Sequence, residues 1–199
     1  ANPETGIKIS KLAIIAGNGS IPFYLIEECR NIGREYCLII IDGHAKELSE
    51  KYQPDFIVSL SKMGHAIKFV KDLGIKNILM VGGVNRPSLK NIFPDLWTAK
   101  FLTTINSKVI GDNSILSKLT MALEKEGFNI IAPEDILPHL ICPKGVLGKF
   151  KPNEQNHKDI INGFKIAKVI GANDIGQSIV IENGFILAVE AAEGTDNMI

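Results

Sequence analysis

A chain of 199 residues is long enough for one large or two small domains, and a composition of 45% hydrophobic and 22% charged residues is typical of a globular protein. Lysine and arginine together number 22, as do aspartate and glutamate, and this balance argues against a nucleic-acid partner. No apolar run approaches the roughly 20 residues that span a bilayer, and the polar N-terminus lacks the pattern of a signal peptide. We therefore expect a cytoplasmic protein with two domains.

The cysteines and histidines do not follow a metal-binding pattern. Cys29, Cys37 and Cys142 are odd in number and widely spaced, which argues against a disulfide framework and against a structural zinc site. The four histidines are also scattered along the chain. Any metal would therefore take oxygen ligands.

Short apolar runs separated by stretches compatible with helices open the chain. They cover residues 12–16, 36–41, 56–60 and 78–81. Near-continuous apolarity, rather than strict alternation, is typical of parallel strands that helices cover on both faces. The rhythm predicts an α/β domain built from β-α-β units.

Two amphipathic stretches, at 94–106 and 113–125, precede another short strand at 128–131. They would complete a Rossmann-like N-terminal domain with a parallel sheet, which we place at residues 1–132. The composition then changes to prolines, glycines and polar residues, which predicts a linker at 133–156.

The last part of the chain predicts a helix at 156–170 and two strands at 178–182 and 185–189. Asn183-Gly184 between two apolar runs is a strong signal for a hairpin. So few residues make a poor independent core. We therefore expect residues 157–199 to be the start of a smaller α/β domain that is truncated at its C-terminus.

A glycine loop follows the first predicted strand. Gly17, Asn18 and Gly19 stand where a strand passes into a helix, a position at which backbone N–H groups bind phosphate. Pro22 occupies the place of the third glycine of the dinucleotide fingerprint, so that match is incomplete. Asp42, at the end of the second strand, could bind a ribose hydroxyl or be a solvated turn residue. Glycines in an ordinary tight turn explain the loop equally well.

Two further segments are candidates for ligand contact. Arg86 follows the fourth strand, at the sheet edge where doubly wound proteins hold their ligands, and a guanidinium matches phosphate oxygens. Surface arginines that pair with ordinary carboxylates are commoner. Asp112 or Asn113 would cap a helix, with ligand contact as a secondary interpretation.

A group of carboxylates follows the last predicted strand. Glu190, Glu193 and Asp196 would cluster there, and together with Asp174 they offer hard oxygen ligands that suit Mg²⁺ or Mn²⁺. The alternative is that the acids merely complement a helix dipole. Thr195 could cap a helix that begins at Asp196.

Several motifs together resemble those of one family. They are IIAGNGSIP at 14–22, Arg86-Pro87, Pro94-Asp95, Gly111-Asp112, Asp159-Ile160 with Gly163, DIGQS at 174–178 and VEAAEGTDNMI at 189–199. Taken in order, they resemble the UDP-2,3-diacylglucosamine pyrophosphatases of the LpxI type, which serve lipid A biosynthesis in Gram-negative bacteria. The tail motif is the most diagnostic of them.

The resemblance implies a Rossmann-like N-terminal domain, a linker and a C-terminal domain of its own type. It also implies metal-dependent hydrolysis of UDP-2,3-diacylglucosamine to UMP and 2,3-diacylglucosamine 1-phosphate (lipid X). Peripheral contact with the inner membrane and a homo-oligomeric state are compatible with it. The alternatives are an NAD-dependent oxidoreductase, motivated by the glycine loop and Asp42, and a non-enzymatic module that binds nucleotide sugars.

The resemblance also assigns roles to residues. Asp196 matches the aspartate of the family's E-G-T-D motif and is expected to be essential for catalysis, with help from Glu193. The expected substrate contacts are Gly17, Asn18, Gly19, Arg86, Gln177 and Thr195. The expected metal ligands are Asp196, Glu193, Glu190 and Asp174.

Overall fold

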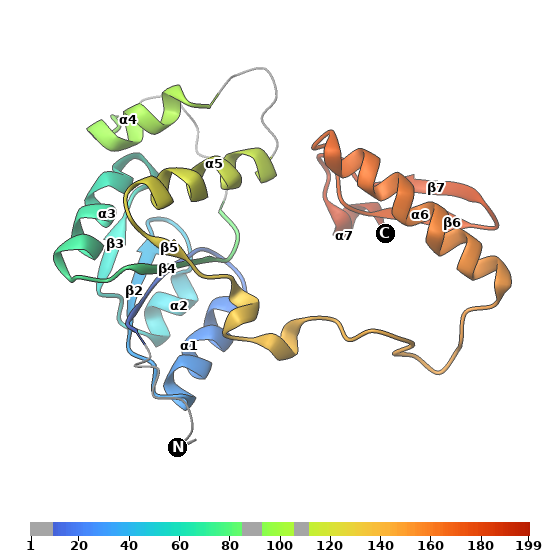
Figure 1. Ribbon diagram of the computed structural model, residues 1–199, viewed down its shortest axis with the longest axis horizontal. Coiled ribbons are helices and arrows are strands. Elements are labelled where there is room, and N and C mark those ends of the chain that lie inside the picture. Colours follow the sequence, from blue (N-terminus) through green and yellow to red (C-terminus); the bar gives the residue numbers. More distant parts are fainter. Residues whose placement is uncertain (1–9, 85–92, 106–111) are drawn as a thin grey trace. The chain divides into compact units, whose positions relative to one another are not determined.

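The computed structural model describes residues 10–84, 93–105 and 112–199, with side chains described from residue 115 in the last range (Figure 1). The chain divides into two compact units. The first unit contains residues 1–105 and 118–142, and the second contains residues 106–117 and 143–199. Each unit has its own sheet.

The sheet of the first unit has five parallel strands in the order β3-β2-β1-β4-β5. The strands are β1 (Leu12–Ala16), β2 (Tyr36–Ile41), β3 (Phe56–Val58), β4 (Asn77–Val81) and β5 (Asn129–Ile130). The predicted Rossmann-like α/β fold is therefore confirmed. The order reverses between β1 and β4, the point at which such sheets usually bind ligands beyond the carboxyl ends of their strands.

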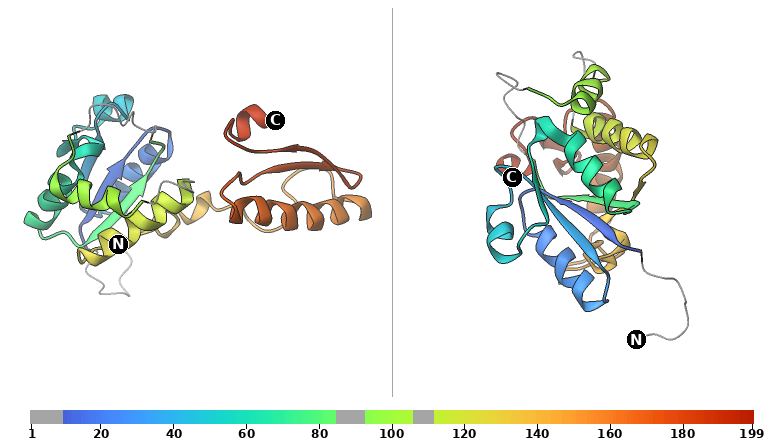
Figure 2. Two further views of the ribbon diagram at one scale, coloured as in Figure 1. Left: turned by 90° about the horizontal axis from the view of Figure 1, so that it is seen from above. Right: turned by 90° about the vertical axis from the view of Figure 1, so that its left-hand side faces the viewer.

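Helices cover both faces of this sheet (Figure 2). They are α1 (Ile21–Asn31), α2 (Lys46–Lys51), α3 (Met63–Asp72), α4 (Leu96–Thr103) and α5 (Asp112–Lys125), with a 3₁₀ turn η1 (Leu60–Lys62) before α3. The third strand ends two residues earlier than predicted, because the chain turns into η1.

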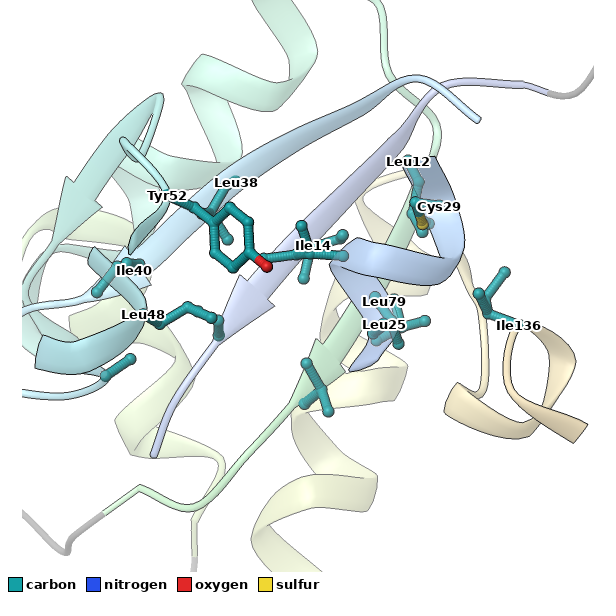
Figure 3. Close-up of a cluster of buried hydrophobic side chains, with 14 of the residues drawn as sticks. Leu12, Ile14, Leu25, Cys29, Leu38, Ile40, Leu48, Tyr52, Leu79 and Ile136 are labelled. Atoms are coloured by element: carbon teal, nitrogen blue, oxygen red, sulfur yellow. The ribbon is translucent and has the colours of Figure 1, made fainter. Parts of the chain in front are cut away.

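Alternate residues of each strand contribute to two separate cores. Ile14 and Leu38 pack with Leu25 of α1 on one face of the sheet (Figure 3). Ala13 and Ile39 pack with residues of α3 on the other face. Because successive side chains of a strand point to opposite faces, both sets must be apolar in a sheet that is covered on both sides.

The beginning of the predicted linker packs against the first unit. It forms two 3₁₀ turns, η2 (Pro133–Asp135) and η3 (Pro138–Leu140). Ile136 and Leu137 between them are 6% and 1% exposed and belong to the same core as Ile14. Pro133 and Pro138 therefore begin short turns that flank two core residues, whereas Pro143 and Pro152 lie in the stretch between η3 and α6, which has no helix or strand.

The second unit consists of α6 (Glu154–Ala172), the antiparallel strands β6 (Ile179–Glu182) and β7 (Phe185–Val189), and the short helix α7 (Thr195–Met198). The hairpin prediction is confirmed, since Asn183 and Gly184 both have positive φ, at 50° and 84°. α6 packs on the hairpin at Gly163, where an added Cβ would lie 3.4 Å from the side chain of Ile181.

One buried carboxylate joins α6 to the hairpin turn. Asp159 is 6% exposed, and its oxygens accept the N–H groups of Asn183 at 2.9 Å and Gly184 at 2.8 Å. The side-chain amide of Gln155 donates a third hydrogen bond at 2.9 Å. Over the described residues, no helix has both the length and the apolar character needed to cross a membrane.

Candidate functional site

The loops after β1 and β4 are bonded to each other. Gly17 donates its N–H to the carbonyl of Val81, and Asn18 and Gly83 exchange two backbone hydrogen bonds of 2.8 Å. A Cβ added at Gly17 would lie 2.4 Å from the carbonyl oxygen of Gly83. The contact between the loops is therefore what requires a glycine at position 17, and not a positive φ.

The side chain of Asn18 ties this loop to a third segment. Its Oδ1 accepts the N–H of Ala45 at 2.8 Å, just before α2. Gly19 has a φ of +109°, and an added Cβ there would meet no atom within 4 Å. Of the two glycines, Gly19 is the one that faces open space.

A pocket of about 650 Å³ adjoins this loop. Its lining residues are Asn18, Gly19, Ser20, Phe23, Tyr24, Ala45, Lys46, Glu47 and Leu48. The pocket combines aromatic rings, one cation (Lys46), one anion (Glu47) and the N-terminal end of α1, where Ser20 makes no side-chain cap. Pro22 lacks an N–H group, however, so this helix end presents fewer donors to a phosphate than a dinucleotide loop does.

The other candidates near the sheet edge are only partly described. Asp42 is exposed at the end of β2, and its carbonyl oxygen lies 3.0 Å from Nδ1 of His44. Arg86 lies outside the described residues. α5 begins at Asp112, and the side chains of Asp112 and Asn113 are also outside the described part, so their expected capping role stays a prediction.

In the second unit, Glu190 lies directly after β7 and is half-buried. Its Oε2 accepts the N–H of Gln177 at 3.1 Å, and its Oε1 accepts the hydroxyl of Thr195 at 3.0 Å. The hydrogen bond from Gln177, followed by that from the side chain of Ser178, holds the pKa of Glu190 below its ordinary value. The carboxylate is therefore ionised at neutral pH, and both of its oxygens accept hydrogen bonds from residues of the second unit.

Glu193 and Asp196 lie at the exposed turn that leads into α7. Oε1 of Glu193 accepts the N–H of Ala191 at 2.9 Å, and Asp196 lies in the first turn of the helix. The N-cap position is Gly194, without a side-chain cap. The prediction that Thr195 caps this helix is wrong, because its hydroxyl donates to Glu190 instead.

Asp174 has a structural role at the end of α6. It adopts a left-handed conformation with a φ of 58°, and its N–H donates to the carbonyl of Gly171. The next residue, Ile175, donates to the carbonyl of Ile170. This pair of bonds is a Schellman motif, in which the left-handed residue terminates the helix.

Within the described ranges, no three His, Cys, Asp or Glu side chains form a group that could hold a metal ion. The predicted ligands Asp174, Glu190, Glu193 and Asp196 thus do not form such a group on their own. Mg²⁺ is commonly held by one or two carboxylates together with phosphate oxygens of a substrate. The exposed pair Glu193 and Asp196 fits that arrangement in donor type, and the metal site stays a prediction.

Two contacts, one in each unit, could not be expected from spacing. Asn18 meets Ala45, 27 residues away, and Glu190 meets Gln177, 13 residues away. Neither pair follows a helical or strand period, so no pattern in the sequence indicates that they touch.

The sheet order, with its reversal beside a glycine loop, defines a Rossmann-like α/β protein with a small additional unit. Residues 11–140 match the LpxI N-terminal domain, and residues 143–199 match the LpxI C-terminal domain. The chain belongs to the LpxI family. It is 33% identical over 193 residues to the UDP-2,3-diacylglucosamine pyrophosphatase LpxI of Caulobacter vibrioides, an alignment that covers 95% of this chain and 68% of that protein.

Solved structures resemble the chain more distantly. The enzyme WbmG of Bordetella bronchiseptica, in complex with NAD and UDP, is 15% identical over 61% of this chain and 36% of its own, with a TM-score of 0.36. The protein gox2253 is 12% identical over 83% of this chain and 48% of its own, with a TM-score of 0.39. The chain thus spans less than half of either structure. Similarity this low supports no conclusion about the ligands or the reaction of this chain.

Proposed function

We propose that this protein hydrolyses UDP-2,3-diacylglucosamine to UMP and 2,3-diacylglucosamine 1-phosphate (lipid X), a step in lipid A biosynthesis. The observation that carries the proposal is the match of both family domains in order, over residues 11–140 and 143–199. The relative from Caulobacter vibrioides, which bears the name of this activity, supports it over 95% of the chain. Because the substrate carries acyl chains, peripheral contact with the inner membrane is part of the proposal.

In the proposed reaction, the oxygen of a water molecule forms a bond to the phosphorus on the sugar side. The bond from that phosphorus to the bridging oxygen breaks, and the bridging oxygen leaves with UMP. Asp196, aided by Glu193, acts as metal ligand or general base. A bound Mg²⁺ or Mn²⁺ would neutralise phosphate charge and lower the pKa of its water. Both carboxylates are exposed, so a charged substrate can reach them.

The glycine loop would contact the uridine or phosphate part of the substrate. Gly19 faces open space beside the pocket, which supports a close approach of the ligand to the backbone there. Gly17 and Asn18 would act indirectly, since both are used in contacts between loops. Arg86 would stabilise developing negative charge, a role in which preorganised donors contribute several kcal/mol.

The two alternative functions have less support. An NAD-dependent oxidoreductase would need a phosphate loop richer in N–H donors than one that contains Pro22. A non-enzymatic binding module would bind the uridine nucleotide without turnover. The family match favours the hydrolase over both.

The test is to incubate UDP-2,3-diacylglucosamine with the purified protein, once with Mg²⁺ and once with EDTA. UMP is then separated from the lipid product and measured. We expect release of UMP that EDTA abolishes. Asp196→Asn should lower kcat by about 100-fold or more, the scale of loss of a group that acts in the transition state. The matched control is Glu182→Gln on the exposed end of β6. Substrate binding without release of UMP would support the binding module instead.

A further inference from the structure

Two separate segments of the second unit meet at the side chain of Glu190. One oxygen of its carboxylate accepts the N–H of Gln177, which precedes β6, and the other accepts the hydroxyl of Thr195, the first residue of α7. The distances are 3.1 Å and 3.0 Å. Hydrogen bonds to an ionised acceptor are roughly twice as strong as those between neutral groups.

The backbone of Glu190 is held by the same segment. Its N–H donates to the carbonyl of Ser178 at 3.0 Å. A Cβ added at Gly176 would lie 2.1 Å from the carbonyl oxygen of Glu190, so only a glycine allows the two backbones to come this close. Both the main chain and the side chain of Glu190 are thus fixed against residues 176–178.

The start of α7 depends on this anchor. α7 has four residues and no side-chain cap, and a helix this short has little stability of its own. The hydroxyl of Thr195 holds its first residue to Glu190, and Asp196 comes next in the chain. A change at Glu190 would therefore release the residue that precedes the proposed catalytic aspartate.

We propose that Glu190 is a positioning residue rather than a metal ligand, and that its carboxylate orients Asp196 by joining Thr195 to Gln177. This inference rests on the proposed function and replaces the metal role that the sequence suggested for Glu190. The contacts of the carboxylate oxygens carry it, since both oxygens accept hydrogen bonds from groups of the protein.

Positioning and metal binding predict different results for Glu190→Gln. The glutamine oxygen accepts the N–H of Gln177, and its NH₂ group donates to the hydroxyl of Thr195, so both contacts persist. We expect kcat to fall by less than about tenfold, with an unchanged Mg²⁺ concentration for half-maximal activity. Glu190→Ala should lower kcat by about 10- to 100-fold, the usual cost of losing a residue that supports a catalytic group. A more than tenfold rise in that Mg²⁺ concentration for Glu190→Gln would overturn the proposal.

The partner residue provides a second measurement. Thr195→Val removes the hydroxyl, and if it acts through Glu190 the double variant with Glu190→Ala should be no slower than Glu190→Ala alone. Independent, additive losses would overturn the proposal. The matched control is Glu182→Gln, which changes an exposed carboxylate at the end of β6.

Amide hydrogen exchange tests the anchor without any turnover. Glu190→Ala should speed exchange in peptides that cover residues 176–178 and 190–199. Glu190→Gln should have a smaller effect, because its hydrogen bonds persist but are no longer made to a charged acceptor. An unchanged exchange in Glu190→Ala would overturn the positioning role. If the wild type releases no UMP while this exchange pattern is found, the proposed function has failed and the anchor itself stands.

Discussion

Removal of the buried carboxylate of Asp159 should destabilise the hairpin turn of the second unit. Asp159 accepts the N–H groups of Asn183 and Gly184, and both turn residues adopt the positive φ that a type I′ turn demands. The two acceptor oxygens thereby hold together α6 and the hairpin, the two main parts of a small unit. Asp159→Ala removes this link and leaves the packing of α6 on β6, which includes Gly163 beside Ile179 and Ile181.

The expected cost follows from the number of bonds. A hydrogen bond to a charged group contributes about 1.5 to 3 kcal/mol, so the two backbone bonds contribute about 3 to 6 kcal/mol together. Asn183 and Gly184 are exposed, so water replaces part of this when the carboxylate is removed. We expect about 3 kcal/mol for Asp159→Ala. Asp159→Asn, which keeps one acceptor oxygen, should cost about half of that, and Gln155→Ala about 1 kcal/mol.

Amide hydrogen exchange of the hairpin is the appropriate assay, because the single tryptophan, Trp97, lies in the first unit. A loss of about 3 kcal/mol corresponds to exchange roughly 100-fold faster in residues 179–189. The fluorescence of Trp97 during denaturation is an internal control and should not change. A change of less than fivefold in the exchange of Asp159→Ala would refute the reasoning, as would equal effects of Asp159→Ala and Gln155→Ala.

Three further predictions concern single residues. Gly17→Ala should destabilise the first unit by about 2 to 4 kcal/mol in chemical denaturation, because the added Cβ collides with the carbonyl oxygen of Gly83. The control Gly83→Ala should be tolerated, since a Cβ at that position meets no atom within 4 Å. Asp174→Gly should raise the thermal stability of the second unit slightly, by up to about 1 kcal/mol, since glycine adopts the left-handed conformation without strain. Acidification through the pKa of Glu126 should destabilise the first unit and change the fluorescence of Trp97, and Glu126→Gln should reduce this dependence on pH.

The sign of the last effect follows from the interactions of Glu126. Its carboxylate accepts a hydrogen bond from the ammonium of Lys71 and, at 2.9 Å, one from the indole of Trp97, and the bond from Lys71 acts most strongly to lower its pKa below the ordinary value of 4.5. A carboxyl group with a lowered pKa in the folded state stabilises the protein above pH 4.5, and this contribution is lost as the pH falls through the folded value. An unchanged acid transition in Glu126→Gln would contradict the assignment.

The outcomes that would contradict the other two are equally direct. Equal destabilisation by Gly17→Ala and Gly83→Ala would show that the collision between the loops is not the cause. A loss of stability in Asp174→Gly would show that its carboxylate contributes more than its strained backbone costs.

The sequence by itself determined the elements and the class of the fold. Apolar runs at 12–16, 36–41 and 78–81 are strands of a parallel sheet, and Asn183-Gly184 forms the hairpin turn. These features depend on short apolar runs and on the φ angles that particular residues adopt, which are local properties that a sequence displays directly. The family was also evident from motifs spread along the chain, and both of its domains match.

Only the tertiary structure decided what the individual polar residues contact. The sequence predicted Glu190 as a metal ligand and gave no sign that its oxygens accept hydrogen bonds from Gln177 and Thr195. The sequence predicted that Thr195 caps the helix, but its hydroxyl donates a hydrogen bond to Glu190 instead. The physical reason is that a carboxylate or hydroxyl binds whichever donor or acceptor lies within about 3 Å. That partner is set by how distant segments pack, which spacing along the chain does not encode.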